Sequence, residues 1–185
     1  MEFLSTYHLK RWVDENQQLF TPPQKTNRVL MAYQDFVVMI LHGPNVRLDF
    51  HVDPGDEFFY QIRGDLALHL KPPGERRQVV TVREGEIFVC PAGLAHSPRR
   101  GADTWGLLIE RRRRPEEAEG FLLFCERCDK EVFSHTLSQG DMAGQLGRVN
   151  EMLNADAGLR TCKGCGYVFP EAPKAERLAF LDAKP

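Results

Sequence analysis

Apolar residues follow two different spacings along the chain. Up to about Gln18 they recur at loosely helical intervals, and Pro22 and Pro23 end any helix that forms there. From Phe36 to Glu110, short runs rich in Val, Ile, Leu and Phe take over. These runs are separated by turn signals: Gly43-Pro44, Asp53-Pro54-Gly55, Gly64-Asp65, Pro72-Pro73-Gly74, Glu84-Gly85 and Pro91-Ala92-Gly93. Turn signals at such regular spacing predict an all-β barrel or sandwich with an N-terminal capping segment.

One run, Val46–His51, alternates strictly between apolar and polar residues. Successive side chains of a strand point to opposite faces, so an extended backbone here would put Arg47, Asp49 and His51 on one face. That face either meets solvent or lines a site.

The composition shifts after the β region. The run Arg111–Arg114 followed by Pro115-Glu116-Glu117 indicates an end to the β domain, and we interpret the arginines as a solvated segment. Helical spacing of apolar residues from Met142 to Leu153 predicts a helix, and a last short helix is expected beyond Ala172. We therefore expect a barrel with its capping segment over residues 1–115 and an extension over 116–185.

Overall composition excludes several classes of protein. The 185 residues carry a formal charge of −2, which argues against a strongly basic nucleic-acid binder. Apolar runs such as Phe36–Leu41 are far shorter than the roughly 18 to 20 residues that cross a bilayer, and no basic region precedes an apolar stretch at the start. We expect a cytoplasmic protein with neither a nucleic-acid nor a membrane partner.

Four of the five cysteines form two C-x-x-C pairs, Cys125 with Cys128 and Cys162 with Cys165. Disulfides are the alternative, but repeated C-x-x-C spacing without a secretory signal favours one metal ion held by four thiolates. The second pair, in Cys-Lys-Gly-Cys-Gly-Tyr, resembles a knuckle of a rubredoxin or zinc ribbon, where glycine lets the backbone fold tightly under the sulfurs. Four thiolates accept iron or zinc. Cys90 is expected to be a buried strand residue.

Two stretches of the β region place glycines and metal-ligand residue types at definite offsets. The first reads Gly43-x5-Asp49-x-His51-x5-Glu57-x6-Gly64, and the second reads Gly85-x5-Pro91-x-Gly93-x2-His96-x3-Arg100. Taken in order, they resemble the two motifs of the cupin superfamily. The resemblance implies a mainly β fold, a double-stranded β-helix or jelly-roll barrel, followed here by a small C-terminal extension with the cysteine metal knuckles.

The departures from the cupin pattern change the expected ligand set. Asp49 occupies the first histidine position and Arg100 stands where asparagine is usual, which leaves His51, Glu57 and His96. Two imidazoles and a carboxylate form the facial triad of non-haem Fe(II) oxygenases, which leaves positions open for substrate and oxygen. Fe(II) suits this mixed set, although zinc, manganese or nickel can occupy it.

Charged residues near the expected ligands indicate an anionic substrate. Arg47 precedes His51 by four positions and Arg100 follows His96 by four, so each arginine shares a strand face with a ligand. The planar fork of arginine pairs with a carboxylate through two hydrogen bonds and stays charged at neutral pH. Glu110 ends an otherwise apolar run and could orient an arginine or accept a substrate hydrogen bond.

The residues also resemble a narrower family, the bacterial type of 3-hydroxyanthranilate 3,4-dioxygenases. The matching segments are Gly43–His51, Glu57–Gln61, Gly85–Phe88, His96–Arg100 and Gly106–Arg111, together with the four cysteines and Arg160-Thr161-Cys162. One departure is Arg99, where the family commonly carries glutamine. It changes local charge only, provided that Arg100 and not Arg99 faces the site.

This resemblance implies Fe(II)-dependent cleavage of the ring of 3-hydroxyanthranilate by O2, giving 2-amino-3-carboxymuconate semialdehyde, in tryptophan degradation toward quinolinate and NAD. It implies that Arg47, Arg100 and Glu110 hold and position the substrate, with Glu57 serving both substrate and metal. The rubredoxin-like cysteine site would bind a second iron, or zinc, in an ancillary role, and the protein would be a homodimer.

Two alternatives stay open on sequence. A cupin dioxygenase could act on a different carboxylated aminophenol, catechol or thiol. A non-catalytic cupin could sense or store a metal-bound small acid, in which case it would bind ligand tightly without consuming oxygen. A cupin sugar isomerase fits less well, because its usual metal set keeps more histidines and lacks paired arginines.

Overall fold

The computed structural model describes residues 6–22, 26–45, 47–138, 140 and 142–171. Strands predominate. The elements are α1 (Leu9–Glu15), a 3-10 turn (Gln17–Leu19), β1 (Asn27–Ala32), β2 (Phe36–His42), β3 (Phe50–Val52), β4 (Glu57–Arg63), β5 (Leu66–Lys71), β6 (Gln78–Val82), β7 (Ile87–Cys90), β8 (Ala95–Arg100), β9 (Trp105–Arg111), β10 (Glu119–Phe124), β11 (Glu131–Leu137) and α2 (Met142–Ala155).

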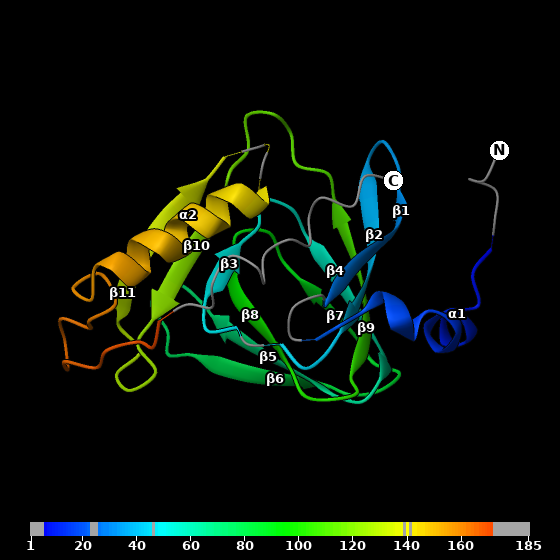
Figure 1. Cartoon of the computed structure of the whole chain (residues 1–185), viewed down its shortest axis with the longest axis horizontal. Helices are drawn as coiled ribbons and strands as arrows, with labels where there is room; N and C mark the ends of the chain where they lie inside the picture. Colours follow the sequence, from blue (N-terminus) through cyan, green and yellow to red (C-terminus); the bar gives the residue numbers. More distant parts are fainter. Residues whose placement is uncertain (1–5, 23–25, 46, 139, 141, 172–185) are drawn as a thin grey trace.

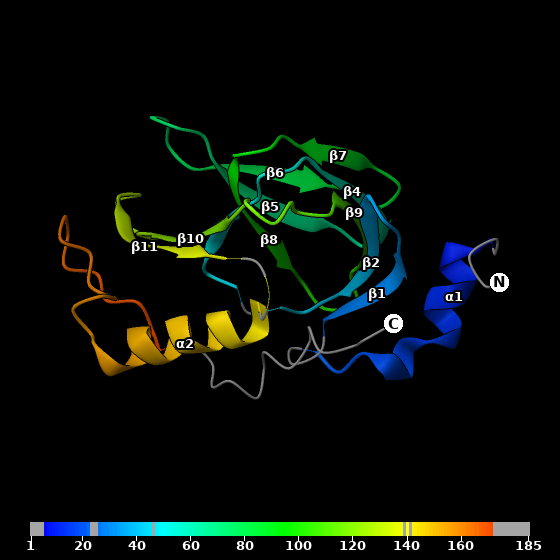
Figure 2. The ribbon, with the colours of Figure 1, turned by 90° about the horizontal axis from the view of Figure 1, so that it is seen from above.

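The strands form two antiparallel sheets, ordered β1-β2-β9-β4-β7 and β11-β10-β3-β8-β5-β6 (Figures 1 and 2). Their pairing is nested, since β2 pairs with β9, β3 with β8, β4 with β7 and β5 with β6. The chain from β2 to β9 is therefore one long hairpin whose arms pass back and forth between the sheets. This is the topology of a jelly roll or double-stranded β-helix, and it confirms the mainly β barrel that the sequence predicts.

Alternating side chains fill the space between the two sheets. Leu66, Leu68 and Leu70 of β5 are buried with Phe59 of β4 and Leu108 of β9 in one apolar cluster. Because side chains on a strand alternate between its faces, residues two positions away from these also face the interior. This parity decides which polar residues reach the inside of the barrel.

Helix α1 covers the outer face of the first sheet, where Val13 packs with Ile40 of β2 and Leu107 of β9. The helix ends at Glu15 and a 3-10 turn follows, so it is shorter than the apolar spacing up to Gln18 suggested. The backbone N–H of the C-cap residue bonds back to the Val13 carbonyl, which closes the last turn.

Helix α2 lies at the other end of the molecule from α1 (Figures 1 and 2). Its buried Val149 and Leu153 pack with Phe121 of β10 and Leu137 of β11. It is the helix predicted between the two cysteine pairs. The further short helix expected beyond Ala172 lies outside the described residues.

The segment before the first ligand differs from the prediction. The alternating run was expected to be a strand throughout, but β3 begins only at Phe50 and residues 47–49 are irregular. The side chain of Asn45 accepts a hydrogen bond from the Arg100 N–H at 2.8 Å and donates one to the Pro98 carbonyl at 2.8 Å. Asn45 therefore ties this segment to β8, which bends it away from a regular strand pairing.

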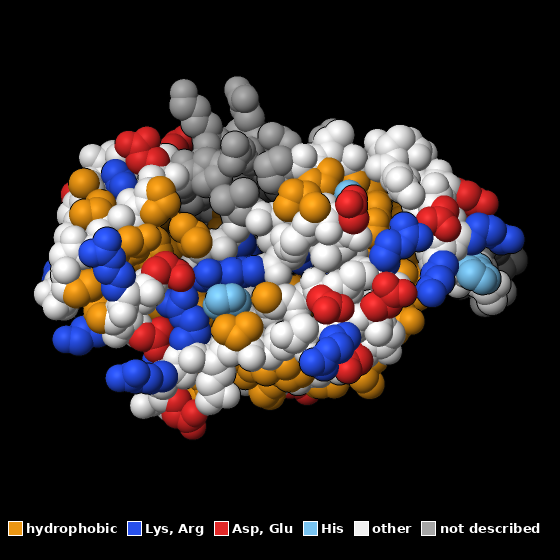
Figure 3. Space-filling model, turned by 90° about the horizontal axis from the view of Figure 1, so that it is seen from below, with side chains coloured by type: hydrophobic (Ala, Val, Ile, Leu, Met, Phe, Trp, Pro, Cys, Tyr) orange, Lys and Arg blue, Asp and Glu red, His pale blue; other side chains and the backbone are white. Residues whose placement is uncertain are grey.

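The expected boundary after residue 115 falls between β9 and β10. Strand β10 pairs with β3, so the chain beyond the boundary continues the second sheet, and α2 and the cysteine turns follow from there. Among the described residues, no helix is both long and apolar enough to span a bilayer. Acidic and basic side chains both occur across the face in Figure 3, in keeping with the small net charge of −2.

Candidate metal centre and active site

Three predicted ligands from three strands meet inside the barrel. His51 of β3 pairs directly with His96 of β8, and their ring centroids are 4.1 Å apart. Glu57 begins β4 in the opposite sheet, and its Oε2 lies 2.6 Å from His96 Nε2 and 3.9 Å from His51 Nε2. One ligand atom from each residue lies within 4.8 Å of the others. The strand register thus gathers a His, Glu, His set from two sheets.

The atoms at this point are buried and lack aligned hydrogen bonds. Within the described structure, His51 Nε2, His96 Nε2 and both Glu57 oxygens have no hydrogen-bond partner. Their close contacts are with one another, as in the 2.6 Å approach of Glu57 Oε2 to His96 Nε2. Buried polar atoms are nearly always partnered, so four such atoms gathered at one point leave a position for a cation. The donor set of two imidazoles and one carboxylate fits Fe(II).

The other nitrogen of each imidazole is already engaged. His51 Nδ1 lies 2.8 Å from Glu119 Oε1, and His96 Nδ1 lies 2.9 Å from the Leu94 carbonyl oxygen. Both partners accept hydrogen bonds, so they place the proton on Nδ1 and leave the Nε2 lone pair free for a metal.

The surroundings of the site favour a neutral imidazole at His51 and an ionised carboxylate at Glu57, the forms that bind a metal ion. Burial, together with the charges of His96 and Arg47, lowers the pKa of His51 well below its ordinary value. Burial alone would raise the pKa of Glu57, but His51 and His96 lower it. Burial alone would lower the pKa of His96, whereas contacts with the Cys90 thiol and Glu57 raise it to about 10. A metal ion and this proton compete for the same nitrogen.

Arg100 is a buried cation inside the same barrel. It lies opposite the core residue Leu66 and is 5% exposed. Its Nη1 donates to Gln61 Oε1 at 2.9 Å, whereas Nη2 has no partner and no carboxylate pairs with the guanidinium among the described residues. Burial lowers the pKa of Arg100 to about 10, so the group remains charged at neutral pH. Such a group attracts an anionic ligand.

Glycine at position 106 makes room for this guanidinium. Gly106 of β9 lies opposite Gln61, and a Cβ there would lie 2.7 Å from Arg100 Nη2. Any larger residue would push the arginine out of its place. Arg99, by contrast, has its Nη2 2.9 Å from Glu126 Oε1 near the surface. The strand therefore turns Arg100 inward and Arg99 outward.

Arg47 lies beside the site but already has a partner. Its Nε and Nη2 lie 2.9 and 2.8 Å from Asp49 Oδ2, and the side chain is 28% exposed. Burial alone would lower the pKa of Arg47, but the charges of Asp49, Glu119 and Glu57 raise it. Arg47 thus lies close enough to Glu57 and Glu119 for their charges to act on it, but on an irregular segment and not on the strand that was predicted.

Glu110 also faces the interior, since it follows the core residue Leu108 by two positions and lies opposite Glu57. Burial and the charge of Glu57 raise the pKa of Glu110 to about 8. Its carboxyl group therefore carries a proton at neutral pH.

Sequence reasoning missed two charged residues of the site. Glu119 accepts a hydrogen bond from the ligand His51, and Arg113 lies 2.9 Å from Glu119 Oε2. The arginine run was interpreted as solvated, but the Arg113 side chain is only 18% exposed. Its partner Asp53 lies 60 positions earlier, before β4, so the local sequence contains no signal that distinguishes Arg113 from Arg112 or Arg114.

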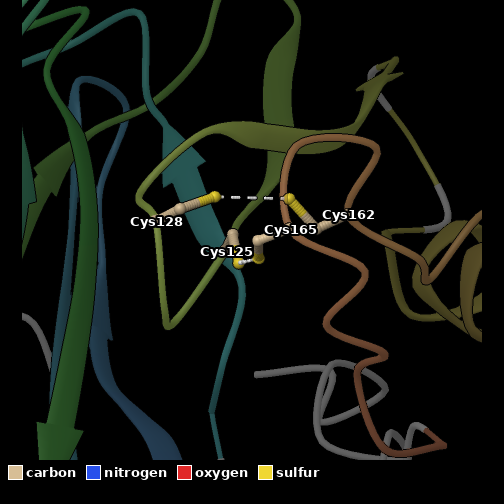
Figure 4. A group of neighbouring side chains, drawn as sticks. All are labelled: Cys125, Cys128, Cys162 and Cys165. Atoms are coloured by element: carbon tan, nitrogen blue, oxygen red, sulfur yellow. Dashed lines mark hydrogen bonds between the residues drawn. The ribbon is translucent and has the colours of Figure 1, made fainter.

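The four cysteines form a second cluster (Figure 4). Cys125 and Cys128 belong to the turn between β10 and β11, and Cys162 and Cys165 to a turn after α2. The Sγ atoms of Cys125 and Cys165 are 3.5 Å apart, and those of Cys128 and Cys162 are 3.4 Å apart. Four sulfurs at these distances fit the binding of one metal ion.

The two cysteine turns share one backbone pattern. In each, the first cysteine donates its N–H to the carbonyl five residues later, and its own carbonyl accepts from the N–H four residues later. That fourth residue is left-handed in both turns, Asp129 with φ of 63° and Gly166 with φ of 72°. The glycine expected to fold the second knuckle is thus matched by an aspartate in the first.

Known proteins resemble this chain over most of its length. Residues 1–153 match the family described as 3-hydroxyanthranilic acid dioxygenase. The chain is 43% identical over 168 residues to the 3-hydroxyanthranilate 3,4-dioxygenase of Bacillus cereus, covering 91% of this chain and 93% of that one. It is 35% identical to the enzyme of the same name from Xanthomonas campestris pv. campestris, covering 95% and 97%.

Among solved structures, a cupin-2 domain protein from Shewanella frigidimarina is similar with a TM-score of 0.45 and 22% identity, over 54% of this chain and 91% of that one. The family match spans both cupin motifs and the first cysteine pair, and the two relatives match over nearly their full lengths. The chain belongs to the 3-hydroxyanthranilic acid dioxygenase family.

Proposed function

We propose that this protein is an Fe(II)-dependent dioxygenase that opens the ring of 3-hydroxyanthranilate with O2 to give 2-amino-3-carboxymuconate semialdehyde. Both oxygen atoms are incorporated, so no further reductant is needed. Family membership supports this reaction, because relatives that match over nearly their full lengths are named 3-hydroxyanthranilate 3,4-dioxygenase.

The observation that carries the proposal is the buried guanidinium of Arg100, which shares the barrel interior with the His51, Glu57, His96 set. A cation in an apolar barrel without a counter-ion is unfavourable unless a ligand supplies the anion. The carboxylate of an aromatic acid does so, and the planar fork orients the ring. A carboxylated substrate beside a metal site accounts for both features.

The residues of this chain act mainly by binding and orientation. His51, Glu57 and His96 would hold the iron, which supplies the redox centre for the reaction of the aromatic ring with O2. Arg100, held by Gln61, receives the substrate carboxylate, and Arg47 faces the same space. The leucine and phenylalanine side chains of the interior exclude water around the ring.

Glu110 would hold a proton at neutral pH and lies across from the ligand Glu57. We assign it to positioning the polar groups of the substrate, because its carboxyl can donate or accept a hydrogen bond there. Fixing bound reactants in one orientation is the main contribution expected of these side chains.

The role of Arg100 is tested with two substrates and two proteins. 3-Hydroxyanthranilate and 2-aminophenol differ by the carboxylate alone, so wild type should prefer the acid. In Arg100→Ala the KM for 3-hydroxyanthranilate should rise roughly 10- to 100-fold, while the KM for 2-aminophenol should not change. Steady-state oxygen uptake with both compounds measures this, with iron content determined for each protein.

Arg99→Ala is the matched control, since the neighbouring arginine is on the outside of the barrel. It should leave the preference for the acid intact. An Arg100→Ala protein that keeps both its iron and its full preference for 3-hydroxyanthranilate would contradict the assignment of Arg100 to the carboxylate.

The remaining expectations rest on the family resemblance. We propose iron in the barrel site, iron or zinc at Cys125, Cys128, Cys162 and Cys165, a cytoplasmic homodimer, and a place in tryptophan degradation toward quinolinate and NAD. The distance of the cysteine turns from the barrel ligands along the chain supports an ancillary role for that second site.

A further inference from the structure

One ligand histidine is held from outside the cupin motifs. Glu119, the first residue of β10, is 7% exposed, and its Oε1 accepts a hydrogen bond from His51 Nδ1 at 2.8 Å. Strand β10 pairs with β3 so that Phe121 lies opposite His51. Glu119 precedes Phe121 by two positions and therefore shares its face, which aims the carboxylate at the imidazole.

The second oxygen of Glu119 is fixed as well. Arg113 Nη2 lies 2.9 Å from Glu119 Oε2, and Arg113 Nε lies 2.8 Å from Asp53 Oδ2. The other oxygen of Asp53 accepts from the Gly55 N–H at 2.7 Å, and Asp53 is 2% exposed. His51 is thus the end of a chain of contacts that runs through a carboxylate, a guanidinium and a second carboxylate.

This chain of contacts restricts the ligand in two ways. A carboxylate acceptor at Nδ1 keeps the proton there and leaves Nε2 as the free lone pair. Arg113 holds the Glu119 carboxylate in place through a second charged contact. The His51 ring therefore cannot rotate without breaking its hydrogen bond to Glu119. In the absence of Glu119, a buried imidazole would have neither a fixed tautomer nor a fixed plane.

The two ligand histidines are held differently. His96 Nδ1 lies 2.9 Å from the carbonyl oxygen of Leu94, two residues away on its own chain segment. His51 depends on a side chain 68 positions later in the sequence. Loss of Glu119 would therefore affect His51 and leave His96 and Glu57 in place.

We propose that Glu119 is a positioning residue that orients His51 for the metal, with Arg113 and Asp53 as its anchor. This inference rests on the proposed function, since it takes His51 as a metal ligand. It gives the segment between β9 and β10 a role in the metal centre that neither cupin motif contains.

Mn(II) is the probe, because it prefers nitrogen and oxygen ligands and is a poor match for the four thiolates. The decrease of the free Mn(II) electron paramagnetic resonance signal on addition of protein gives the affinity without substrate or oxygen. Carboxylates behind a ligand histidine typically change metal affinity 10- to 100-fold. We expect a loss of that size in Glu119→Ala and a smaller one in Glu119→Gln, which keeps an acceptor oxygen.

Matched controls come from neighbouring residues. Glu117 pairs with Arg111 at 2.8 Å, so Glu117→Ala should keep the Mn(II) affinity within about twofold. Arg113→Ala should lower it, by less than Glu119→Ala. With saturating Fe(II), Glu119→Ala should lower kcat while the KM for 3-hydroxyanthranilate stays within about twofold, since the substrate arginines are untouched.

The outcomes separate this inference from the proposed function. Wild type that binds no more Mn(II) than His96→Ala would overturn the metal site itself, and the positioning role with it. Wild type that binds Mn(II) while Glu119→Ala and Glu119→Gln bind equally well would overturn the positioning role alone. An equal loss in Glu119→Ala and Glu117→Ala would indicate general destabilisation and would also overturn it. Should Glu119→Ala fail to fold, comparison of the Mn(II) affinity of Glu119→Gln with that of Glu117→Ala decides.

Discussion

The barrel site and the cysteine site are built on different structural supports. His51, Glu57 and His96 lie on strands from two sheets, and Glu57 and His96 are each 1% exposed. The cysteines lie on two turns, and Cys165 is exposed. In the barrel, the strand register determines which ligand atoms lie together. In the cysteine turns, the local backbone conformation of each turn brings its two sulfurs together. Three nitrogen and oxygen ligands would leave positions of a metal ion open to substrate, whereas four sulfurs would complete the coordination of an ion.

Buried or partly buried arginines anchor both sites, in different ways. Arg77 donates to the Phe124 and Cys125 carbonyls and lies 3.3 Å from Asp129, which fixes the first cysteine turn to the barrel. Arg160 donates to the Leu153 carbonyl at 2.7 Å and so ties the second turn to α2. Both of these arginines bind backbone carbonyls of the chain near a cysteine turn, whereas Arg113 binds the carboxylate side chain that orients a ligand.

The largest effect should come from removing a barrel ligand. His51→Ala leaves two of three ligands, so iron in the barrel should be lost and turnover should fall by roughly a thousandfold or more. The metal at the cysteines should stay, because none of its ligands changes. Metal analysis of the purified variant alongside oxygen uptake measures both. A folded His51→Ala protein that loses metal from both sites would contradict the prediction that the two sites bind metal independently.

A cysteine substitution should have the opposite pattern. Cys125→Ser should release the metal of the cysteine turns and lower Tm by roughly 10 °C, because binding at such a site contributes to folding of the turns it joins. Turnover per barrel iron should stay within a few-fold of wild type. A Cys125→Ser protein that keeps its fold and its barrel metal but loses all turnover would contradict the ancillary role.

The smallest effect concerns the partly buried carboxyl of Glu110, whose pKa is raised, whereas the pKa values of Glu126 and Asp129 in the first cysteine turn are lowered. Its pKa is raised to about 8 from an ordinary 4.5, so it stabilises the fold fully below about pH 4.5 and this contribution is lost as pH rises through 8. Glutamine in Glu110→Gln does not ionise, so the variant does not lose this contribution to stability as the pH rises. In metal-free protein, its Tm relative to wild type should increase by several degrees from pH 5 to pH 9.

Thermal melts of both metal-free proteins across this pH range provide the measurement. A Tm difference that stays constant from pH 5 to pH 9 would mean that Glu110 ionises as a free carboxyl does, and the assignment of a protonated carboxyl to Glu110 would be wrong.

Much of the barrel could be predicted because its signals are local. Turn residues between short apolar runs indicated the β fold, and each cupin motif lies within one stretch of chain. The four-residue interval from His96 places Arg100 on the inner face of a regular strand, with Arg99 outside. For Arg47 only the expected strand was wrong, because Asn45 holds that segment against β8 and β3 starts only at Phe50.

Contacts between distant segments could not be predicted in this way. Glu119 and Arg113 lie in a stretch of charged residues where several side chains are exposed. Only the pairing of β10 with β3 brings Glu119 to His51. The sequence likewise did not predict that Asp129 and Gly166 occupy equivalent positions in the two cysteine turns, because the aspartate adopts a left-handed conformation that is most common for glycine.

The most direct test of the account is turnover itself. Protein reconstituted with Fe(II) without oxygen is mixed with 3-hydroxyanthranilate and then exposed to air, while oxygen consumption and the near-ultraviolet band of the muconate semialdehyde are followed together. We predict that one O2 is consumed for each semialdehyde formed. Protein with iron at His51, Glu57 and His96 that consumes no oxygen and forms no product would contradict the proposed function.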